Sequence, residues 1–202
     1  MRDLTTTLFN VPARATTVGQ GSLMIANPFV DEACFNHSVV SIVDYDESDG
    51  ALGLVMNNQT GHTLDSYLDG VSSESGVQVY CGGPLGSDRM VFMHTLGEDV
   101  FAGAKQFAPG LWLGGDFDAA IDYVNSGYPL DGLIRFFIGY SGWTADQLKS
   151  ELLGNSWAVS DCPSDKTMLL SLSDDAYWHR YVRMLGEPYR AWQLMPREPR
   201  AN

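Results

Sequence analysis

The chain has 202 residues, of which 45% are hydrophobic and 18% are charged. This composition indicates a globular protein with a substantial core and excludes an intrinsically disordered chain. The formal net charge of −13 disfavours contact with a phosphate backbone, because nucleic-acid sites are normally basic.

Residues 1–18 are polar, Thr-rich and aperiodic, so we predict a flexible N-terminal arm followed by a single domain over residues 19–202. The first residues lack the apolar stretch of a signal peptide, and no window approaches the roughly 18 apolar residues of a membrane helix. We therefore expect a soluble, cytoplasmic protein with no membrane contact.

Short apolar and β-branched runs, bounded by turn residues, predict most of the strands. The early strands follow one another directly, whereas the later ones alternate with helices, which predicts an α+β fold rather than a doubly wound α/β fold. The predicted strands are 21–26, 38–45, 51–56, 77–81, 90–94, 107–113, 133–138 and 157–159.

Capping residues and glycines set the predicted helix ends. Thr144 and Gln147 have the spacing of a capping box. The predicted helices run from Thr63 to Gly70, from Asp116 to Gly127, from Thr144 to Gly154, and from Ser173 or Asp174 to Gly186. We predict a core that includes Ile25, Val39, Val40, Leu54, Val55, Phe136, Ile138, Leu148 and Leu152.

Positive charge is concentrated near the C-terminus. Residues 176–202 contain five Arg and two Glu, a local charge of +3, so residues 1–175 carry −16. We interpret the basic residues as a solvated helix face followed by a loose end. They are Arg180, Arg183, Arg190, Arg197 and Arg200.

Neither of two possible metal motifs is complete. Asp44-x-Asp46-x-Ser48 resembles the start of a calcium loop, but the positions for Gly and Glu hold other residues, so a hairpin turn is favoured. Cys34-x-x-His37 offers half of a zinc site, without a second close pair. The cysteines Cys34, Cys81 and Cys162 are far apart and odd in number, which indicates reduced thiols.

The segment Gly139–Trp143 lies between an apolar run and a capped helix, which is the setting of a nucleophile elbow. Gly142 follows Ser141 immediately, so the Gly-x-Ser-x-Gly spacing is off by one. His94 or His179 could act as the base, but the sequence does not order them. The segment could instead hold an anion at the helix N-terminus, or be a tight strand-to-helix turn in which glycine relieves crowding.

Three further features are candidates for a site: a glycine turn, an arginine and a tryptophan. Gly82-Gly83-Pro84 is typical of a turn, and turns at strand ends often carry binding residues. Arg135 lies within an apolar run, so its charge requires an acidic or carbonyl partner, and it is either a structural strut or a ligand contact. Trp143 can line a pocket or fill the core.

Several segments, in the same order and with fitting spacing over residues 19–187, resemble the bacterial AlgH/YqgE family. The most specific is Arg135-Phe136-Phe137-Ile138-Gly139-Tyr140-Ser141-Gly142-Trp143, which continues through Gln147-Leu148, Glu151-Leu152 and Asn155-Ser156-Trp157. The others are Gly21–Pro28, Phe35 with Ser38–Val40, Gly50–Asn57, Gly82–Pro84 and His94. One departure is Asn58-Gln59 after Asn57, where the family commonly has a basic residue and Pro.

The resemblance implies an α+β fold with a small closed β-barrel, a branching mixed sheet and surrounding helices. The family name comes from a proposed role in transcriptional control of alginate synthesis. The resemblance carries over no catalytic residue, no cofactor and no metal.

Two functional hypotheses follow. The first is a non-enzymatic regulatory or interaction protein that acts through a protein or small-molecule partner, without direct DNA contact. The alternative is a hydrolase or nucleotide-binding enzyme that uses the Gly139–Trp143 turn. In the first case we expect the loops to line one shared concavity. Its candidate residues are Asn57, Gly82, Gly83, Pro84, His94, Arg135, Tyr140, Ser141, Trp143 and Gln147.

Overall fold

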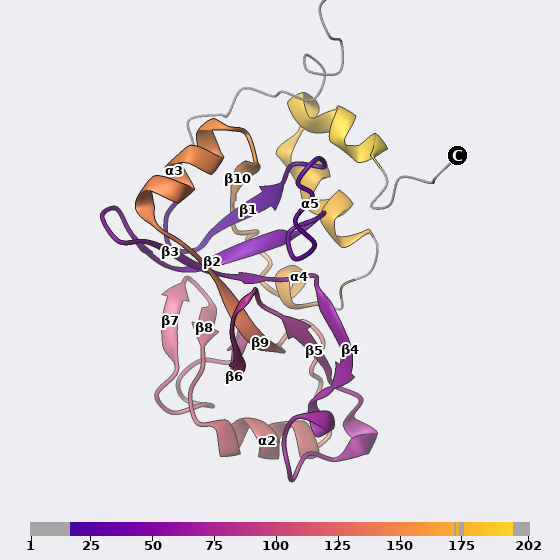
Figure 1. Ribbon diagram of the computed structural model, residues 1–202. Coiled ribbons are helices and arrows are strands. Elements are labelled where there is room, and N and C mark those ends of the chain that lie inside the picture. The colour runs from indigo at the N-terminus through magenta and orange to yellow at the C-terminus, as the bar shows by residue number, and fades with distance from the viewer. Residues whose placement is uncertain (1–16, 172, 174–175, 196–202) are drawn as a thin grey trace, which may run out of the picture.

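One branched mixed sheet runs through the protein, with helices against both of its ends (Figure 1). The computed structural model describes residues 17–171, 173 and 176–195. The described strands are β1 (Ser22–Ala26), β2 (Val39–Asp46), β3 (Gly50–Val55), β4 (Gln59–Thr63), β5 (Gln78–Cys81), β6 (Leu85–His94), β7 (Lys105–Ala108), β8 (Leu111–Leu113), β9 (Ile134–Trp143) and β10 (Trp157–Asp161).

The sheet branches at β9. The main path has the order β10-β1-β2-β3-β9-β6-β8-β7. Strand β5 pairs with β9 in the parallel direction, and its other edge pairs with β4 in the antiparallel direction. The C-terminal part of β9 pairs with β3, and its N-terminal part pairs with β5 and β6. The strands in the lower part of Figure 1 curl into a half-barrel. The path of paired strands, among those described, has free ends at β10 and β7. The α+β class and the branching are as expected, and closure of the barrel is not confirmed.

Helices cover the two ends of the sheet. Figure 1 shows α3 and α5 beside β1, β2 and β10, and α2 below the curled strands. The described helices are α2 (Phe117–Asn125), α3 (Ala145–Leu153), α4 (Thr167–Leu170) and α5 (Tyr177–Leu185), with 3-10 helices η1 (Leu64–Ser66), η2 (Ser73–Ser75) and η3 (Glu187–Leu194).

Two of the predicted caps are present. Asp116 accepts a hydrogen bond from the backbone N–H of Ala119, and Thr144 accepts one from Gln147, so both side chains satisfy a free donor at a helix start. Thr63 makes no such bond, and the helix expected after it is only the single turn η1.

The segment Gly139–Trp143 is a strand and not the strand-to-helix turn that was expected. Residues 134–137 are buried on both faces of the sheet, and from Ile138 onward buried and partly exposed residues alternate. Such alternation is the pattern of a strand with one covered face. Glycine and serine at the alternating positions hid the pattern, because neither residue type favours strands.

Three other expectations differ from the structure. The run 107–113 is two strands, β7 and β8, separated by a turn at Gly110, whose φ is 73°. The polar strand β4 has no apolar pattern and was not expected. Residues 187–194, within the basic C-terminal region where a loose end was expected, form η3, because Tyr189 and Trp192 are buried in the core. Arg197 and Arg200 lie outside the described residues.

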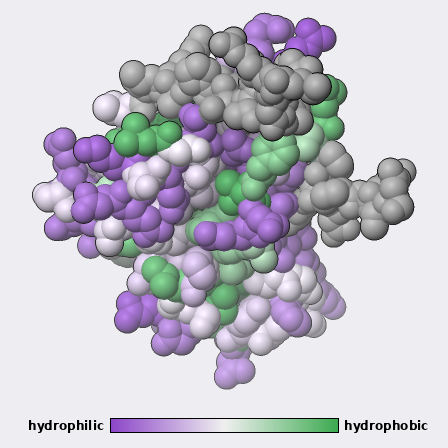
Figure 2. Space-filling view, turned by 45° about the horizontal axis from the view of Figure 1, so that its top comes forward, coloured by the Kyte–Doolittle hydropathy of each residue, from purple (hydrophilic) through white to green (hydrophobic). Residues whose placement is uncertain are grey.

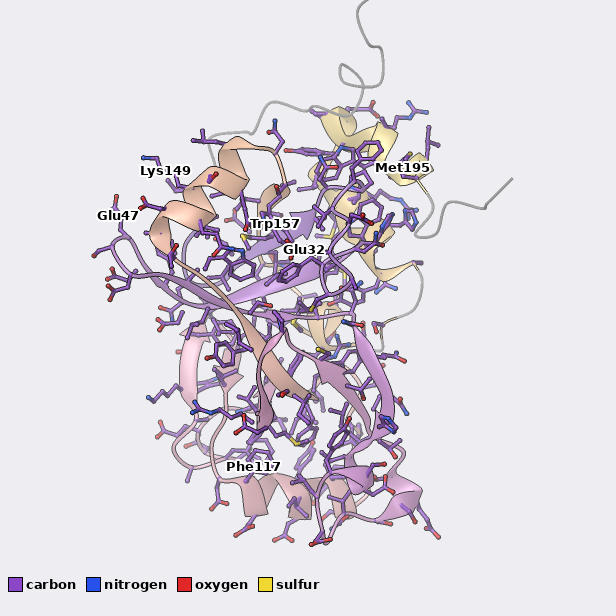
Figure 3. The ribbon with its side chains drawn as sticks, in the orientation of Figure 1. Glu32, Glu47, Phe117, Lys149, Trp157 and Met195 are labelled. Atoms are coloured by element: carbon purple, nitrogen blue, oxygen red, sulfur yellow. The ribbon has the colours of Figure 1, made fainter. Side chains whose placement is uncertain are left out.

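The expected core is formed as predicted. Of the nine residues, Ile138 and Leu152 are partly buried and the others are buried. The expected arm falls mostly outside the described residues, but Val18, at its end, is buried beside α3 and β2. Figure 3 shows how side chains from both faces of the sheet fill the interior, with Trp157 directed inward beneath α3.

Candidate functional site

The two glycine-rich segments of the sequence cross each other in the fold. A side chain on Gly82 would collide with the carbonyl oxygen of Gly139, and one on Gly83 would collide with the Ser141 hydroxyl. Gly139 has φ of 69°, which favours glycine, and a Cβ there would lie 2.7 Å from the carbonyl oxygen of Gly83. These glycines therefore allow the turn after β5 to pack directly on β9.

Ser141 stabilises this crossing. Its side chain is fully buried, and its hydroxyl donates a hydrogen bond of 3.1 Å to the carbonyl oxygen of Gly82. The hydroxyl proton is directed at a backbone carbonyl oxygen. This hydrogen bond joins the two segments.

A groove lies over Gly142, on the face of β9 opposite the crossing of the two glycine-rich segments. Leu52 of β3 pairs with Gly142, and Leu85 of β6 pairs with Tyr140. A Cβ on Gly142 would lie 3.2 Å from the Leu85 side chain, 3.5 Å from Leu52 and 3.9 Å from Tyr140, so the three side chains converge over the glycine. The groove has a volume of about 470 Å³, and Leu52 and Leu85 are 41% and 44% exposed.

Acidic residues border this groove. Asp44, Asp46 and Asp49, from the β2–β3 hairpin, line it together with the apolar side chains. Asp46 accepts hydrogen bonds from the Ser48 hydroxyl and from two backbone N–H groups, and these bonds hold its pKa below its ordinary value. The hairpin turn expected here is thus confirmed, and its carboxylates give the groove a negative rim.

Glu151 of α3 fixes the wall behind the groove. Its carboxylate accepts hydrogen bonds from the indole N–H of Trp143 (2.9 Å), from the indole N–H of Trp157 (2.7 Å) and from the Gln147 amide (2.8 Å). Both indoles are almost fully buried and pack edge to face. Trp143 therefore fills the core, and only the groove-side part of it lines the concavity.

Arg135 occupies a different place, near the beginning of β9. It is buried, and its guanidinium donates to the carbonyl oxygens of Met56 and Ser171, which meets the expectation of a carbonyl partner. The guanidinium also lies 4.2 Å from the centre of the Tyr80 ring, a cation–π distance. Arg135 thus links β9 to the residue that follows β3 and to the segment after α4.

His94 is the last residue of β6 and is fully buried. Its Nε2 donates to the carbonyl oxygen of Gly114 at 3.1 Å, while Nδ1 has no hydrogen-bond partner, and its ring packs against Phe92 and Phe101. Burial lowers the pKa of His94, so the imidazole is neutral at pH 7. Because its pair on β9 is Ile134, His94 is seven positions, about 23 Å, from Ser141 along the strand.

Cys34 and Cys81 are distant in the sequence but in contact in the fold. The Cys34 thiol forms a hydrogen bond with Cys81 that lowers the pKa of Cys81 to about 6, and burial opposes this shift. The same bond, together with burial, raises the pKa of Cys34. Among the described residues, no group of three or more His, Cys, Asp or Glu side chains is arranged to hold a metal ion.

The AlgH-like family model matches residues 23–190. This chain belongs to the AlgH-like family. It is 38% identical over 183 residues to a UPF0301 protein of Parabacteroides distasonis, with 91% of each chain covered. It is 32% identical to a UPF0301 protein of Bacteroides fragilis, with 99% of this chain and 100% of the relative covered.

Solved structures share the AlgH-like fold. A crystal structure of a protein from Corynebacterium diphtheriae matches with a TM-score of 0.72 at 19% identity, covering 92% of this chain and 96% of the other. The solution structure of AlgH from Pseudomonas aeruginosa matches with a TM-score of 0.67 at 24% identity, covering 86% and 93%. Within the described residues, no helix has the length and apolar character needed to cross a membrane.

In this AlgH-like chain the ten candidate residues occupy several places. Three of them, Tyr140, Trp143 and Gln147, line the groove. Gly82, Gly83 and Ser141 lie in the glycine crossing behind it, and Pro84 is exposed at the turn. Asn57 accepts a hydrogen bond from the Val39 N–H and donates to the carbonyl oxygen of His37. Arg135 and His94 lie further along β9 and β6.

Sequence reasoning missed the residues that form most of the groove. Leu52 and Leu85 are single leucines. The sequence around Leu52 predicts only a strand, and the sequence around Leu85 predicts only a turn. Only the pairing of β3 and β6 with β9 brings them together. Glu151 was noted only as part of the family pattern. A usable signal was its spacing from Gln147, since residues four apart lie on the same side of a helix.

Proposed function

We propose that this AlgH-like chain is a non-enzymatic regulatory or interaction protein that binds a protein partner in the groove over Gly142. The observation that carries the proposal is the convergence of Leu52, Leu85 and Tyr140 into an exposed apolar concavity with an acidic rim. Surface leucines are common singly, whereas several that converge beside polar residues are typical of interaction sites.

The occupant we propose is a segment of a partner that carries leucine or another apolar side chain between Lys and Arg residues. The apolar side chain would rest on Leu52 and Leu85, and the basic residues would face Asp44, Asp46 and Asp49. Charge complementarity favours this occupant over an acidic one, since the rim and the net charge of −13 are both negative. Figure 2 shows one face of the protein, with separate apolar patches among hydrophilic residues.

Rigid surroundings support a binding role. The floor is the paired strand β9, and the wall is fixed by the three hydrogen bonds to Glu151. A pre-formed groove of this kind binds without a large ordering cost. In the proposed role the protein acts in the cytoplasm. Any control of transcription is indirect, because residues 1–175 carry a net charge of −16, which disfavours direct contact with DNA.

A capped synthetic peptide with central leucines between Lys and Arg residues tests the proposal by backbone amide shift mapping. We expect saturable shifts at Leu52, Leu85, Tyr140 and Gly142. A peptide with Glu in place of the basic residues should not bind. Raising the salt concentration from 0.1 M to 1 M shortens the Debye length from about 10 Å to about 3 Å and should weaken binding.

Matched variants locate the interaction. Leu85→Asp should weaken peptide binding at least tenfold, because it places a charge at the centre of an apolar contact. Val100→Asp is the control. Val100 is 42% exposed, close to the 44% of Leu85, and does not line the groove. Equal affinity of the two variants, or equal binding of the basic and acidic peptides, would show the proposed site to be wrong.

A further inference from the structure

Two cysteines that are far apart in the sequence meet beside the end of β5. Cys34 lies in the turn before β2, and Cys81 is the last residue of β5. Their side chains form a hydrogen bond with each other, and both are free, partly exposed thiols. A pair of this kind can react with a small molecule from solvent and then within itself, as a single buried cysteine cannot.

The turn that carries Cys34 is anchored to the core. The backbone N–H of Phe35 donates a hydrogen bond of 2.8 Å to the carbonyl oxygen of Glu32. The centre of the Phe35 ring lies 5.7 Å from that of the Trp143 ring and 5.4 Å from that of the Trp157 ring. Because the residue next to Cys34 is held in this way, the fold sets the position of the Cys34 thiol.

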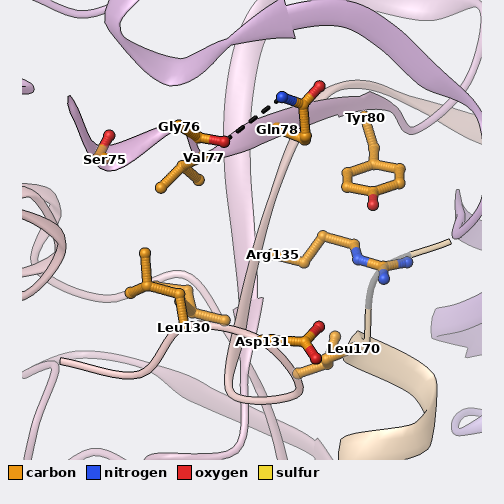
Figure 4. Close-up of a pocket in the computed structure, with 10 residues that line it drawn as sticks. Ser75, Gly76, Val77, Gln78, Tyr80, Leu130, Asp131, Arg135 and Leu170 are labelled. Atoms are coloured by element: carbon orange, nitrogen blue, oxygen red, sulfur yellow. Dashed lines mark hydrogen bonds between the residues drawn. The ribbon is translucent and has the colours of Figure 1, made fainter. Parts of the chain in front are cut away.

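Strand β5 places Cys81 on the face of the strand that meets this turn. Tyr80 points toward Arg135 (Figure 4), and consecutive strand side chains point to opposite faces, so Cys81 points away from Arg135. The backbone N–H of Cys81 donates to the carbonyl oxygen of Asn58 at 2.7 Å, and the Asn58 side chain forms a hydrogen bond with Cys34. Both cysteines therefore converge on the same residue.

The hydrogen bond between the cysteines makes the two thiols chemically unequal. It lowers the pKa of Cys81 to about 6, although burial opposes this shift, and it raises the pKa of Cys34, as burial also does. At pH 7 Cys81 is therefore mostly a thiolate, the form that attacks electrophiles, and Cys34 is a protonated thiol that donates to it.

We propose that Cys34 and Cys81 form a reversible dithiol–disulfide site that reacts with a small hydroperoxide. The Cys81 sulfur attacks the terminal peroxide oxygen, the O–O bond breaks, and the leaving oxyanion takes a proton from water. Cys81 is then a sulfenic acid. The Cys34 sulfur attacks the Cys81 sulfur, the S–O bond breaks, and hydroxide leaves with the Cys34 proton as water. The two sulfurs lose two electrons in total, the peroxide gains them, and an external thiol restores both cysteines.

The arrangement favours oxidation over other reactions of a thiol pair. A disulfide bond is about 2 Å long, so sulfurs that are already in hydrogen-bonding contact need only a small approach. Both thiols are only partly exposed, which suits a small oxidant. Within the part of the chain that the structure describes, no group of three or more potential metal ligands includes the pair, which disfavours a metal site.

Peptide mapping of the full, unaltered chain by mass spectrometry tests the proposal. Equimolar hydrogen peroxide at pH 7 should join Cys34 to Cys81 within one chain, and dithiothreitol should restore both thiols. Cys162 is the internal control, because it is also free and partly exposed, and burial raises its pKa. It should remain a thiol, and Cys162→Ala should form the disulfide as the unaltered chain does.

Two replacements of Cys34 separate its two roles. Cys34→Ser removes the second sulfur but keeps a hydrogen-bond donor, so Cys81 should stop at the sulfenic acid, which dimedone captures. Cys34→Ala removes the donor as well. A return of the Cys81 pKa from about 6 toward 9 lowers the thiolate fraction at pH 7 about 90-fold and raises its nucleophilicity about 15- to 30-fold. We therefore expect dimedone labelling about three to six times slower than in Cys34→Ser. Unfolding curves establish that each variant is folded.

Several outcomes would overturn the proposal. They are the absence of a Cys34–Cys81 disulfide, a disulfide that forms only with Cys162 or between chains, and dimedone labelling of Cys162 rather than Cys81 in Cys34→Ser. Equal labelling rates in Cys34→Ser and Cys34→Ala would also contradict it, because the hydrogen bond would then not activate Cys81. These measurements use no peptide ligand, so failure here and failure of the groove site are distinguishable.

Discussion

Replacing Glu151 with alanine should destabilise the folded protein, because the Glu151 side chain connects α3 to β9 and β10. The change removes the acceptor of two buried indole N–H groups, those of Trp143 and Trp157. Each buried donor left without a partner costs about 1–3 kcal/mol, which gives about 2–6 kcal/mol for the pair. Because Glu151 is itself partly exposed, water can enter the vacated space, and we expect the lower part of this range, about 2–4 kcal/mol.

Urea unfolding followed by tryptophan fluorescence measures this loss as a change in the free energy of unfolding. Glu187→Ala is the control, since that side chain is 86% exposed and its contact with Arg190 is 3.9 Å long. The control should change stability by no more than about 0.5 kcal/mol. A loss below about 1 kcal/mol for Glu151→Ala would refute the argument that its hydrogen bonds hold the groove wall.

Four further results are expected. Phe136→Ala should cost about 3–5 kcal/mol, because the ring is fully buried, and calorimetry should still show one transition. The pKa of His94 is lowered, so folding favours its neutral form, and stability should fall as the pH drops below about 6.5, less so in His94→Gln. Iodoacetamide should modify Cys81 with a midpoint near pH 6, and Cys34→Ala should move that midpoint toward 9. The isolated protein should not bind DNA with nanomolar affinity at about 150 mM salt.

The sequence allowed the fold class and most strands to be predicted because their signals are local. The apolar runs of β1, β2 and β3 and the caps Asp116 and Thr144 depend on neighbouring residues only. Strand β4 is polar and forms because β5 lies beside it. Likewise, η3 follows from the packing of Tyr189 and Trp192 against distant residues, which no local pattern contains.

The candidate site could be predicted only in part for a related reason. Tyr140, Trp143 and Gln147 were selected because they lie in one short, distinctive segment, and they do line the groove. Leu52 and Leu85 come from two other strands, and their contact depends on the register of β3 and β6 with β9. The contact between Cys34 and Cys81 likewise depends on tertiary structure.

The segment Gly139–Trp143 illustrates why a short motif is weak evidence for catalysis. A nucleophile elbow needs small residues because its backbone turns sharply. Here small residues are needed because two backbone segments cross: Gly82 and Gly83 face Gly139 and Ser141 so closely that no side chain fits. The serine hydroxyl then completes the crossing by donating to Gly82. The same residue types thus satisfy a packing requirement, and the surface this packing creates, the glycine-floored groove on the opposite face of β9, is where we place the function.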